Sequence, residues 1–494
     1  MNELIKRLAA KVTVDYQRLS IVSNPDGLLS QEAVRTLLYQ QHGLEVVSGT
    51  NMQLRIHFEL EYKRSRSQDS SFKCIYVTKS IETILPDMRQ EAYLCDFCVG
   101  DLFPLFTDKS LLQGLPFEVL TELYDQCAMR RINLVEGSLL VDNIVKEHEK
   151  RAKQSAEYCL AQLASINVDW RKPMQTINAV SEIVVNAVRN GVYPQIMSGI
   201  ATINQNFQDW IDSYYFATLQ SNHLLHPKSV NKILPHLSEK YGKEEKVALL
   251  VVDGFAYWQY TILRHYLQGR GLETQDGTTL SWLPSITMLS RQAIFRGATP
   301  LQDYKQSPEN ERKLWQTFWQ EHGIGSYETQ YLSDKDEFAI NEGVKRLAIV
   351  TVEMDSKMHS STDYRDLLSL TENWCHRITE KIQTVLQAGY NLYLTTDHGS
   401  TLSYGWRTIS AVEAVFLYTD GSRGRRHLIY KNIEEQERFH KENQEHPLLK
   451  HDNWISIRDD SCFAREGETM ITHGGSHFME VIIPFVEIKK EKLK

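Results

Sequence analysis

The sequence predicts an α/β protein whose carboxyl-terminal half is built on a mostly parallel sheet flanked by helices. Four short runs rich in β-branched residues carry this prediction: VALLVVDGF, LAIVTVEMD, NLYLTTDHG and MEVIIPFVEI. Helix-sized segments separate them, and such runs are typical of strands buried on both faces of a parallel sheet. A chain of 494 residues is too long for one ordinary domain. We expect an α/β part over 1–105, a helical part over 106–240 and the sheet domain over 245–494.

The first part contains one alternating pattern and one helical pattern. Residues 52–62, MQLRIHFELEY, alternate apolar and polar side chains, which predicts a half-buried strand. FKCIYVTKS then reads as the returning strand of a hairpin. SQEAVRTLLYQQHG predicts a helix that Ser30 caps and Gly43 ends.

Composition excludes several classes of protein. The net charge of −8 gives no overall attraction to nucleic acid. Seven cysteines do not describe a disulfide framework, and the pair Cys95 and Cys98 lacks the second pair that a zinc site needs, so we expect free buried thiols. No apolar run reaches the roughly 18–20 residues of a membrane span. The polar amino-terminal stretch is unlike a secretory signal, so we expect a cytoplasmic protein without membrane association.

Acidic and histidine side chains follow the predicted strands of the last part. In an open α/β sheet, ligands bind beyond the carboxyl ends of the strands. Carboxylates and imidazoles together suit Zn²⁺ or Mn²⁺ better than a metal that prefers thiolates. The candidate ligands are Asp253, Asp355, His359, Asp397, His398 and His473.

A candidate nucleophile lies between the first and second ligands. LPSITMLSRQAIFRG places Ser285, Thr287 and Ser290 in a proline-opened turn before a helix-compatible segment. A hydroxyl at a helix amino terminus beside a divalent cation is activated, and the same helix end favours phosphate oxygens. Arg291 and Arg296 follow in the helix and are candidate phosphate-binding residues.

The ordered motifs DGF, LPSITMLSRQAIFRG, DSKMH, TTDHG and THGG…EVIIP resemble the PglZ domain, a branch of the alkaline phosphatase superfamily. The resemblance covers residues 245–494 and implies an alkaline-phosphatase-like core with two divalent ions, Zn²⁺ in preference to Mn²⁺. It implies that the ion activating the nucleophile is held by Asp253, Thr287, Asp397 and His398. It implies that the second ion, which stabilises the leaving oxygen, is held by Asp355, His359 and His473. The residues after THGG depart from the family pattern, and His477 is an alternative to His473.

The function that follows is phosphoester hydrolysis through a covalent phospho-threonine at Thr287, the residue on which the family's nucleophile falls. The substrate is a phosphorylated small molecule or an oligonucleotide. Basic residues downstream, Arg407 and the cluster of Arg423, Arg425 and Arg426, favour a phosphodiester if they face the site. The sulfatase arrangement C/S-x-P-x-R and the P-loop pattern are absent from the sequence.

Two other functions remain open at this stage. A phosphomutase of the same superfamily would share the metal ligands but would need a cap to exclude water, and 300–340 is long enough only for a modest cap. The chain could instead act as a scaffold or docking subunit, because PglZ proteins resemble components of bacterial anti-phage systems. Residues 1–240 would then bind partner proteins.

Overall fold

The computed structural model describes residues 2–68, 72–127, 130–220, 226–301, 303–361, 363–418 and 425–490. The chain divides into two compact units, Met1–Gln154 and Ser155–Lys494. The boundary falls inside the long helix α7 (Leu134–Ser165). The division into three parts at about 105 and 240 stays a prediction.

The first unit is built around a parallel sheet with the strand order β2-β3-β1-β4. Two apolar layers cover its faces, one around α1 and α2 and the other around α3 and the π-helical turn that continues it. The strands are β1 (Leu19–Ser23), β2 (Leu44–Ser48), β3 (Lys73–Thr78) and β4 (Ala92–Asp96). The helical segments are α1 (Glu3–Val12), α2 (Glu32–His42), α3 (Asn51–His57), the π-helical turn (Phe58–Tyr62), α4 (Lys63–Gln68), α5 (Pro86–Gln90) and α6 (Phe117–Cys127).

Residues 52–62 are helical, so the strand predicted there is wrong. Three apolar residues spaced four apart are buried: Leu54, Phe58 and Tyr62. Ile56 and Leu60, which completed the alternating pattern, are 51% and 67% exposed. The spacing of four places the buried side chains on one helix face, and this burial decides the structure over the alternation.

The hairpin prediction is also wrong, because β3 is a strand but pairs in parallel with β1 and β2. Helix α2 begins after Gln31 rather than Ser30. Gly43 ends α2 as predicted, with a positive φ of 64° that favours glycine. Cys95 and Cys98 are free thiols and are partly rather than fully buried.

The second unit contains a seven-stranded sheet with the order β6-β17-β10-β5-β9-β8, to which β7 adds by pairing with β17. The strands β10, β5, β9 and β8 are parallel, and β17 runs antiparallel to β10, β6 and β7. The strands are β5 (Val247–Val252), β6 (Leu272–Gln275), β7 (Thr278–Leu280), β8 (Thr329–Ser333), β9 (Arg346–Thr351), β10 (Asn391–Thr396) and β17 (Ile482–Lys490). The α/β class with a mostly parallel sheet is therefore confirmed.

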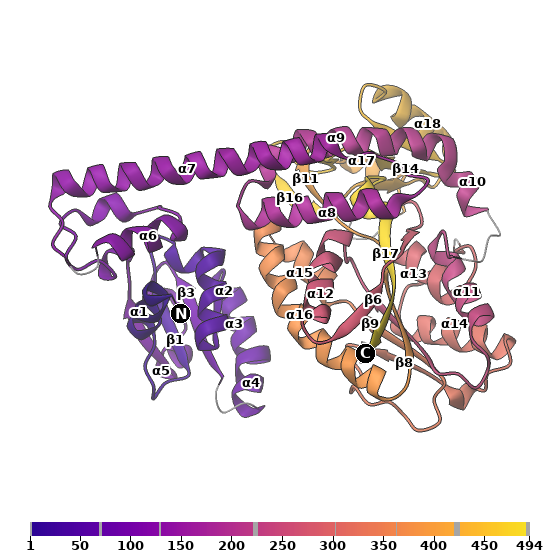
Figure 1. The fold of residues 1–494 in the computed structure, drawn as a ribbon, viewed down its shortest axis with the longest axis horizontal. Helices are drawn as coiled ribbons and strands as arrows, with labels where there is room; N and C mark the ends of the chain where they lie inside the picture. The colour runs from indigo at the N-terminus through magenta and orange to yellow at the C-terminus, as the bar shows by residue number, and fades with distance from the viewer. Residues whose placement is uncertain are drawn as a thin grey trace. The chain divides into compact units, whose positions relative to one another are not determined.

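Helices lie on both sides of this sheet (Figure 1): α12, α15 and α16 on one side, and α11, α13 and α14 on the other. Every side chain of β5 is buried, as the apolar run predicted. The α-helices are α8 (Pro173–Arg189), α9 (Tyr193–Trp210), α10 (Phe216–Leu219), α11 (Ile233–Lys240), α12 (Tyr257–Gln268), α13 (Thr287–Arg296), α14 (Pro308–Glu321), α15 (Glu353–Ser360), α16 (Tyr364–Gln387), α17 (Ala411–Ala414), α18 (Ile433–Glu442) and α19 (Phe478–Val481).

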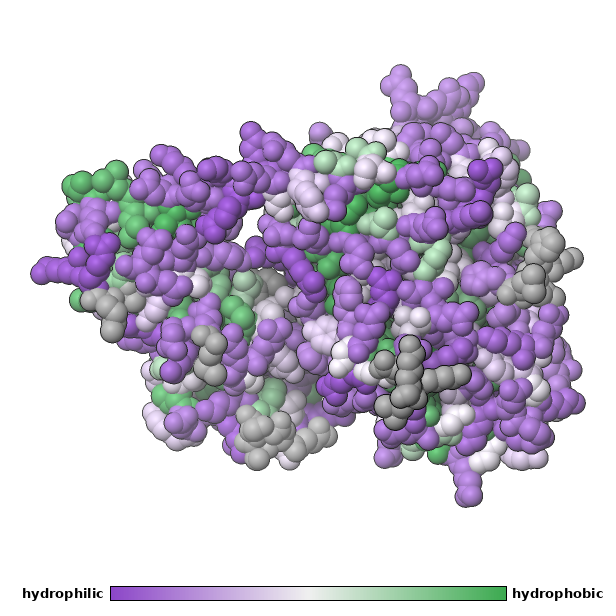
Figure 2. Space-filling model, viewed as in Figure 1, coloured by the Kyte–Doolittle hydropathy of each residue, from purple (hydrophilic) through white to green (hydrophobic). Residues whose placement is uncertain are grey.

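Two three-stranded sheets complete the second unit, β15-β11-β16 and β12-β14-β13. Their strands are β11 (Thr401–Gly405), β12 (His427–Ile429), β13 (Leu448–His451), β14 (Trp454–Ile457), β15 (Ser461–Cys462) and β16 (Thr469–Thr472). The surface seen in Figure 2 is mainly hydrophilic, with hydrophobic residues in small groups, one of them over the region of α8 and α9. Within the described ranges, no helix is both long and apolar enough to cross a membrane.

Candidate active site

The carboxyl ends of three neighbouring parallel strands carry most of the candidate ligands. Strand β5 pairs in register with both β10 and β9, so the three strands end at one edge of the sheet. Asp253 follows β5, and Asp397 and His398 follow β10. Helix α15 begins two residues after β9, so Asp355 and His359 lie one helical turn apart. His473 enters from the loop that follows β16.

These side chains form two groups of potential metal ligands, Asp253 with Asp397 and His398, and Asp355 with His359 and His473. In each group the donor atoms lie within 4.8 Å of one another. His398 Nε2 is 3.7 Å from Asp253 Oδ1 and 3.8 Å from Asp397 Oδ2. Asp355 Oδ1 is 3.4 Å from His359 Nε2 and 3.7 Å from His473 Nε2.

The two groups are neighbours, because the rings of His398 and His473 stack with centroids 3.9 Å apart. In both imidazoles, Nδ1 contacts a backbone carbonyl oxygen, which fixes the orientation of the ring. His398 Nδ1 lies 2.9 Å from the Gly399 carbonyl oxygen, and His473 Nδ1 lies 3.0 Å from that of Ser285. A carbonyl accepts only from a protonated nitrogen, so Nε2 of each ring carries the lone pair that a metal needs.

The electrostatics of the site fit divalent cations. Asp355 Oδ1, His359 Nε2 and Asp397 Oδ2 are buried and have no hydrogen-bond partner. Buried polar atoms without partners are costly, and one metal ion in each group would satisfy them. Oxygen and imidazole donors of this kind suit Zn²⁺ and Mn²⁺.

Burial and crowding of like charges shift the pKa values of the carboxyl groups. Burial, with the charge of Asp397 beside it, holds the pKa of Asp253 well above its usual range. Burial likewise raises the pKa of Asp397. Burial acts in the same direction on Asp355, but its 3.4 Å contact with His359 and the charge of His473 outweigh it and lower the pKa to about 2. A bound dication would stabilise the ionised form of the two raised groups.

Thr287 is the hydroxyl residue that the structure brings to the ligands. It is the first residue of α13, and its Oγ1 lies 3.3 Å from Asp253 Oδ1 and 3.1 Å from His398 Nε2. The two competing serines are engaged elsewhere. Ser285 Oγ donates to Glu480 Oε2 at 2.7 Å, and Ser290 Oγ accepts the backbone N–H of Trp282 at 3.0 Å.

Arg291 lies four residues after Thr287, but its charge is already paired. Its guanidinium donates to Asp253 Oδ2 and to Glu311 Oε2, both at 2.7 Å. Arg291 and Glu311 are 3% and 0% exposed. Burial lowers the pKa of Arg291, but the charges of Glu311 and Asp253 outweigh it and raise the pKa well above the usual value. Arg291 therefore fixes the orientation of one candidate ligand and is itself held by α14.

The other predicted phosphate-binding arginines make contacts of a different kind. Arg296 donates to the carbonyl of Thr299, and Arg407 forms an ion pair with Glu413 at 2.6 Å. Arg425 is exposed, and its backbone N–H donates to a threonine hydroxyl of β16. Arg423 lies outside the described residues. Substrate binding by Arg296, Arg407 and Arg425 stays a prediction that these contacts do not support.

His477, the alternative ligand, lies apart from both groups. Its Nε2 is 3.3 Å from Asp460 Oδ1, and its Nδ1 accepts the backbone N–H of Met479 at 3.2 Å. His473, by contrast, belongs to the group around Asp355. The histidine within THGG, which the resemblance favoured, is thus the one that lies beside another candidate ligand.

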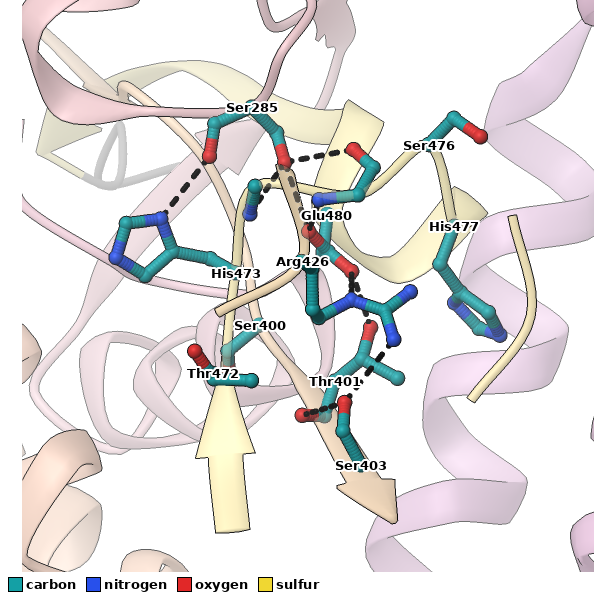
Figure 3. Close-up of polar contacts among 12 residues, drawn as sticks. Ser285, Ser400, Thr401, Ser403, Arg426, Thr472, His473, Ser476, His477 and Glu480 are labelled. Atoms are coloured by element: carbon teal, nitrogen blue, oxygen red, sulfur yellow. Dashed lines mark hydrogen bonds and ion pairs between the residues drawn. The ribbon is translucent and has the colours of Figure 1, made fainter. Parts of the chain in front are cut away.

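Two buried glutamates near the site were missed from the sequence. Glu311 holds Arg291, and Glu480 accepts hydrogen bonds from several loops (Figure 3). Glu311 lies in the strongly charged stretch ENERK, where nothing distinguishes a buried glutamate from an exposed one. Glu480 offered a weak signal, since it is a single acidic residue inside the apolar run FMEVIIPFV.

Comparison with known proteins identifies one family. The alkaline phosphatase-like domain of PglZ from the BREX system matches residues 231–488. Murine ectonucleotide pyrophosphatase/phosphodiesterase 5 is 13% identical with a TM-score of 0.36, over 50% of this chain and 90% of that one. Phosphonoacetate hydrolase from Sinorhizobium meliloti is 9% identical with a TM-score of 0.34, over the same 50% and 90%. The curated protein sequences gave no match. On the match over residues 231–488, the chain belongs to the family of the PglZ alkaline phosphatase-like domain of the BREX system.

Proposed function

We propose that the chain is a phosphoesterase that depends on two divalent ions, Zn²⁺ or Mn²⁺, and uses Thr287 as its nucleophile. The observation that carries the proposal is the position of Thr287 Oγ1, 3.3 Å from Asp253 and 3.1 Å from His398 at the amino terminus of α13. Asp253, Asp397, His398 and Thr287 would hold one ion, and Asp355, His359 and His473 the other. When bound, the ions would supply Lewis-acid activation of the nucleophile and of the leaving oxygen.

The residues of the chain would then act as follows. Thr287 Oγ1 attacks phosphorus, the bond to the leaving alcohol breaks, and a phospho-threonine forms. Water hydrolyses this ester in a second step and restores the hydroxyl. The first N–H groups of α13 would be available to the phosphoryl oxygens, because the amino-terminal amides of a helix lack a partner within it. Burial of Asp253 and Asp397 keeps competing water away from these groups.

The charge on the nucleophile's side of the site favours a diester over a monoester. A monoester carries one more negative charge on phosphorus, which requires an additional cation. Arg291 is the candidate cation on α13, but Glu311 and Asp253 already neutralise it. A monoanionic phosphodiester needs no such partner, which supports phosphodiesterase activity over phosphatase activity.

The organisation of 300–340 disfavours a phosphomutase. Helix α14 belongs to the core of the sheet domain, because Trp315 and Trp319 are buried in the same apolar cluster as β5. Strand β8 is the edge strand of the main sheet. Neither element is a separate cap that would shield a phospho-enzyme from water, so transfer to water is the favoured outcome.

We further propose that the chain acts within a bacterial defence system of the BREX type, since its family is named for that system. Residues 1–154 carry neither of the two ligand groups proposed for catalysis. This unit is therefore the candidate surface for partner proteins. The role rests on the family resemblance and is independent of the catalytic proposal.

Hydrolysis of bis(p-nitrophenyl) phosphate and p-nitrophenyl phosphate tests the catalytic proposal. Zn²⁺- or Mn²⁺-loaded protein should turn over the diester faster than the monoester, and EDTA should abolish both. Thr287→Ala should lose at least about 10³-fold in kcat, as expected when a nucleophile is removed. Thr384→Ala, which removes an exposed hydroxyl of α16, should match the wild type. Equal activity of Thr287→Ala and wild type would refute the assignment.

A further inference from the structure

We propose that Glu480 is a positioning residue of the active site, a buried clamp that holds together the loops of the nucleophile Thr287 and of the candidate ligands His398 and His473. This inference rests on the proposed function for its effect on catalysis. The clamp itself is argued only from hydrogen bonds within the chain and does not depend on that function. Figure 3 shows the carboxylate of Glu480 at the centre of side chains that come from separate segments.

The carboxylate of Glu480 is fully buried and accepts four hydrogen bonds. Oε2 accepts from the hydroxyl of Ser285 and the backbone N–H of Gly475, both at 2.7 Å. Oε1 accepts from the hydroxyl of Thr401 at 2.9 Å and from Nε of Arg426 at 2.7 Å. A buried carboxylate with this number of donors is well satisfied and rigid.

Two of these donors belong to the loops of Thr287 and His473. Ser285 precedes Thr287 by two residues, and its carbonyl oxygen fixes the ring of His473 through a 3.0 Å contact with Nδ1. Gly475 follows His473 by two residues. Glu480 holds both Ser285 and Gly475 on one oxygen and so reinforces the direct contacts of Ser285 Oγ with the Gly474 N–H at 3.0 Å and the Gly475 carbonyl at 2.8 Å.

The third loop is the one that follows β10. Thr401 lies three residues after His398 and donates to Oε1 of Glu480. The backbone carbonyl of Glu480 accepts a further hydrogen bond from the N–H of Gly399 at 2.9 Å. The side chain and the main chain of Glu480 thus both hold the segment that presents His398.

Arg426 makes the clamp specific for a carboxylate. It is fully buried, pairs with Glu480, and donates to the hydroxyl of Ser403 at 3.1 Å and to the backbone carbonyls of Asp459 and Ser461. A glutamine at position 480 would turn an amide N–H₂ toward groups that are themselves donors. It would also leave the guanidinium buried without a counter-charge.

The test compares Glu480→Gln with Glu487→Gln in the full chain. Glu487 is a second buried, ion-paired glutamate a few residues along in β17, whose partner is Lys240 at 3.0 Å. Thr401→Val is a milder variant, because it keeps the volume and removes one of the four donors. Hydrogen exchange of metal-free protein, Zn²⁺ affinity by titration, and kcat and KM for bis(p-nitrophenyl) phosphate are the readouts.

For Glu480→Gln we expect at least about tenfold faster amide exchange at 283–287 and 473–476 and about 10–100-fold weaker Zn²⁺ binding, the usual effect of losing a residue that orients ligands. kcat should fall by a similar factor, with KM within about twofold of wild type because Glu480 touches no substrate. Thr401→Val should show a smaller loss, and Glu487→Gln none.

Wild-type exchange at both segments in folded Glu480→Gln would overturn the clamp. If Glu480→Gln fails to fold, unchanged exchange at 398–402 and unchanged Zn²⁺ affinity in Thr401→Val would overturn it instead. If the wild type hydrolyses neither ester, the proposed function fails, while exchange at Gly475 still decides whether Glu480 holds the loops.

Discussion

At the scale of single residues, the site is a set of buried charges that balance one another. Arg291 joins Asp253, a candidate ligand at a strand end, to Glu311, which is wholly buried in α14. The guanidinium cannot serve both as the counter-charge of two carboxylates and as the receptor for an additional phosphoryl charge. Glu311 therefore determines how much of the Arg291 charge is available to a bound phosphate.

Replacing Glu311 by glutamine should shift the substrate preference toward monoesters. The change keeps the shape of the side chain and raises the net charge of Arg291, Asp253 and position 311 together from −1 to 0, so the site repels an additional phosphoryl charge less. We expect the ratio of monoester to diester kcat/KM to rise roughly tenfold or more, since one buried charge a few ångströms away is worth several kcal/mol. Both rates are measured with p-nitrophenyl esters.

The matched control is Glu309→Gln, which removes an exposed carboxylate from the same helix, paired with Lys313 at 2.8 Å. It should leave the ratio unchanged. A folded Glu311→Gln protein with the wild-type ratio would contradict the role assigned to Glu311.

The site residues that could be predicted from the sequence differ in one physical respect from those that could not. Asp253, Asp397 and His398 follow apolar runs directly, and the ends of parallel strands meet at one edge of a sheet, so their proximity was predictable. Glu311 and Glu480 act through the packing of distant segments. No periodicity or spacing in the sequence marks Glu311 as buried, and only its position inside an apolar run marks Glu480.

At the scale of elements, the loop after β10 packs so closely against the segment before β17 that no side chain fits at position 399. A Cβ placed on Gly399 would lie 2.0 Å from the carbonyl oxygen of Met479 and 3.2 Å from Cα of Ala256. Both neighbours are backbone atoms, which cannot move without moving α19 or α12. The glycine therefore allows His398 and Glu480 to come from adjoining segments.

Gly399→Ala should destabilise the second unit by about 1–3 kcal/mol, the usual cost of overpacking, and should weaken Zn²⁺ binding because His398 is displaced. Urea unfolding gives the first quantity and metal titration the second. Gly242→Ala is the control, because its Cβ would meet only a glutamate side-chain oxygen at 3.5 Å. Equal stability of Gly399→Ala and Gly242→Ala would show that the contact is not a tight one.

Elements also show where sequence patterns mislead. The four apolar runs of the second unit became β5, β9, β10 and β17 because burial on both faces leaves a continuous apolar stretch. The alternating stretch 52–62 became a helix because Leu54, Phe58 and Tyr62 repeat with a spacing of four as well as two. A spacing of four residues fits one face of a helix and also one face of a strand. The two structures differ in whether the intervening residues Ile56 and Leu60 are buried, and both are exposed here.

At the scale of the whole molecule, the proposed metal ligands all lie in the unit Ser155–Lys494. Metal binding to the folded form should therefore stabilise this unit. At a free metal concentration a hundredfold above Kd, the gain in free energy of unfolding is about 2.7 kcal/mol for each site. Urea unfolding of wild type in Zn²⁺ and in EDTA measures it.

Hydrogen exchange should place the added protection in 155–494, and Asp253→Ala should lose most of it. Glu244→Gln is a suitable control because Glu244 is an exposed partner of Lys345. Identical unfolding curves of the wild type with Zn²⁺ and with EDTA would contradict a metal site of the proposed kind.

The central claim, that Thr287 forms a covalent phosphoryl ester during turnover, is tested most directly by acid-quenching the metal-loaded protein with bis(p-nitrophenyl) phosphate and sequencing its peptides by mass spectrometry. The predicted result is a phosphoryl adduct on Thr287, absent in Thr287→Ala. An adduct on Ser285 or Ser290, or rapid turnover by Thr287→Ala, would contradict the account.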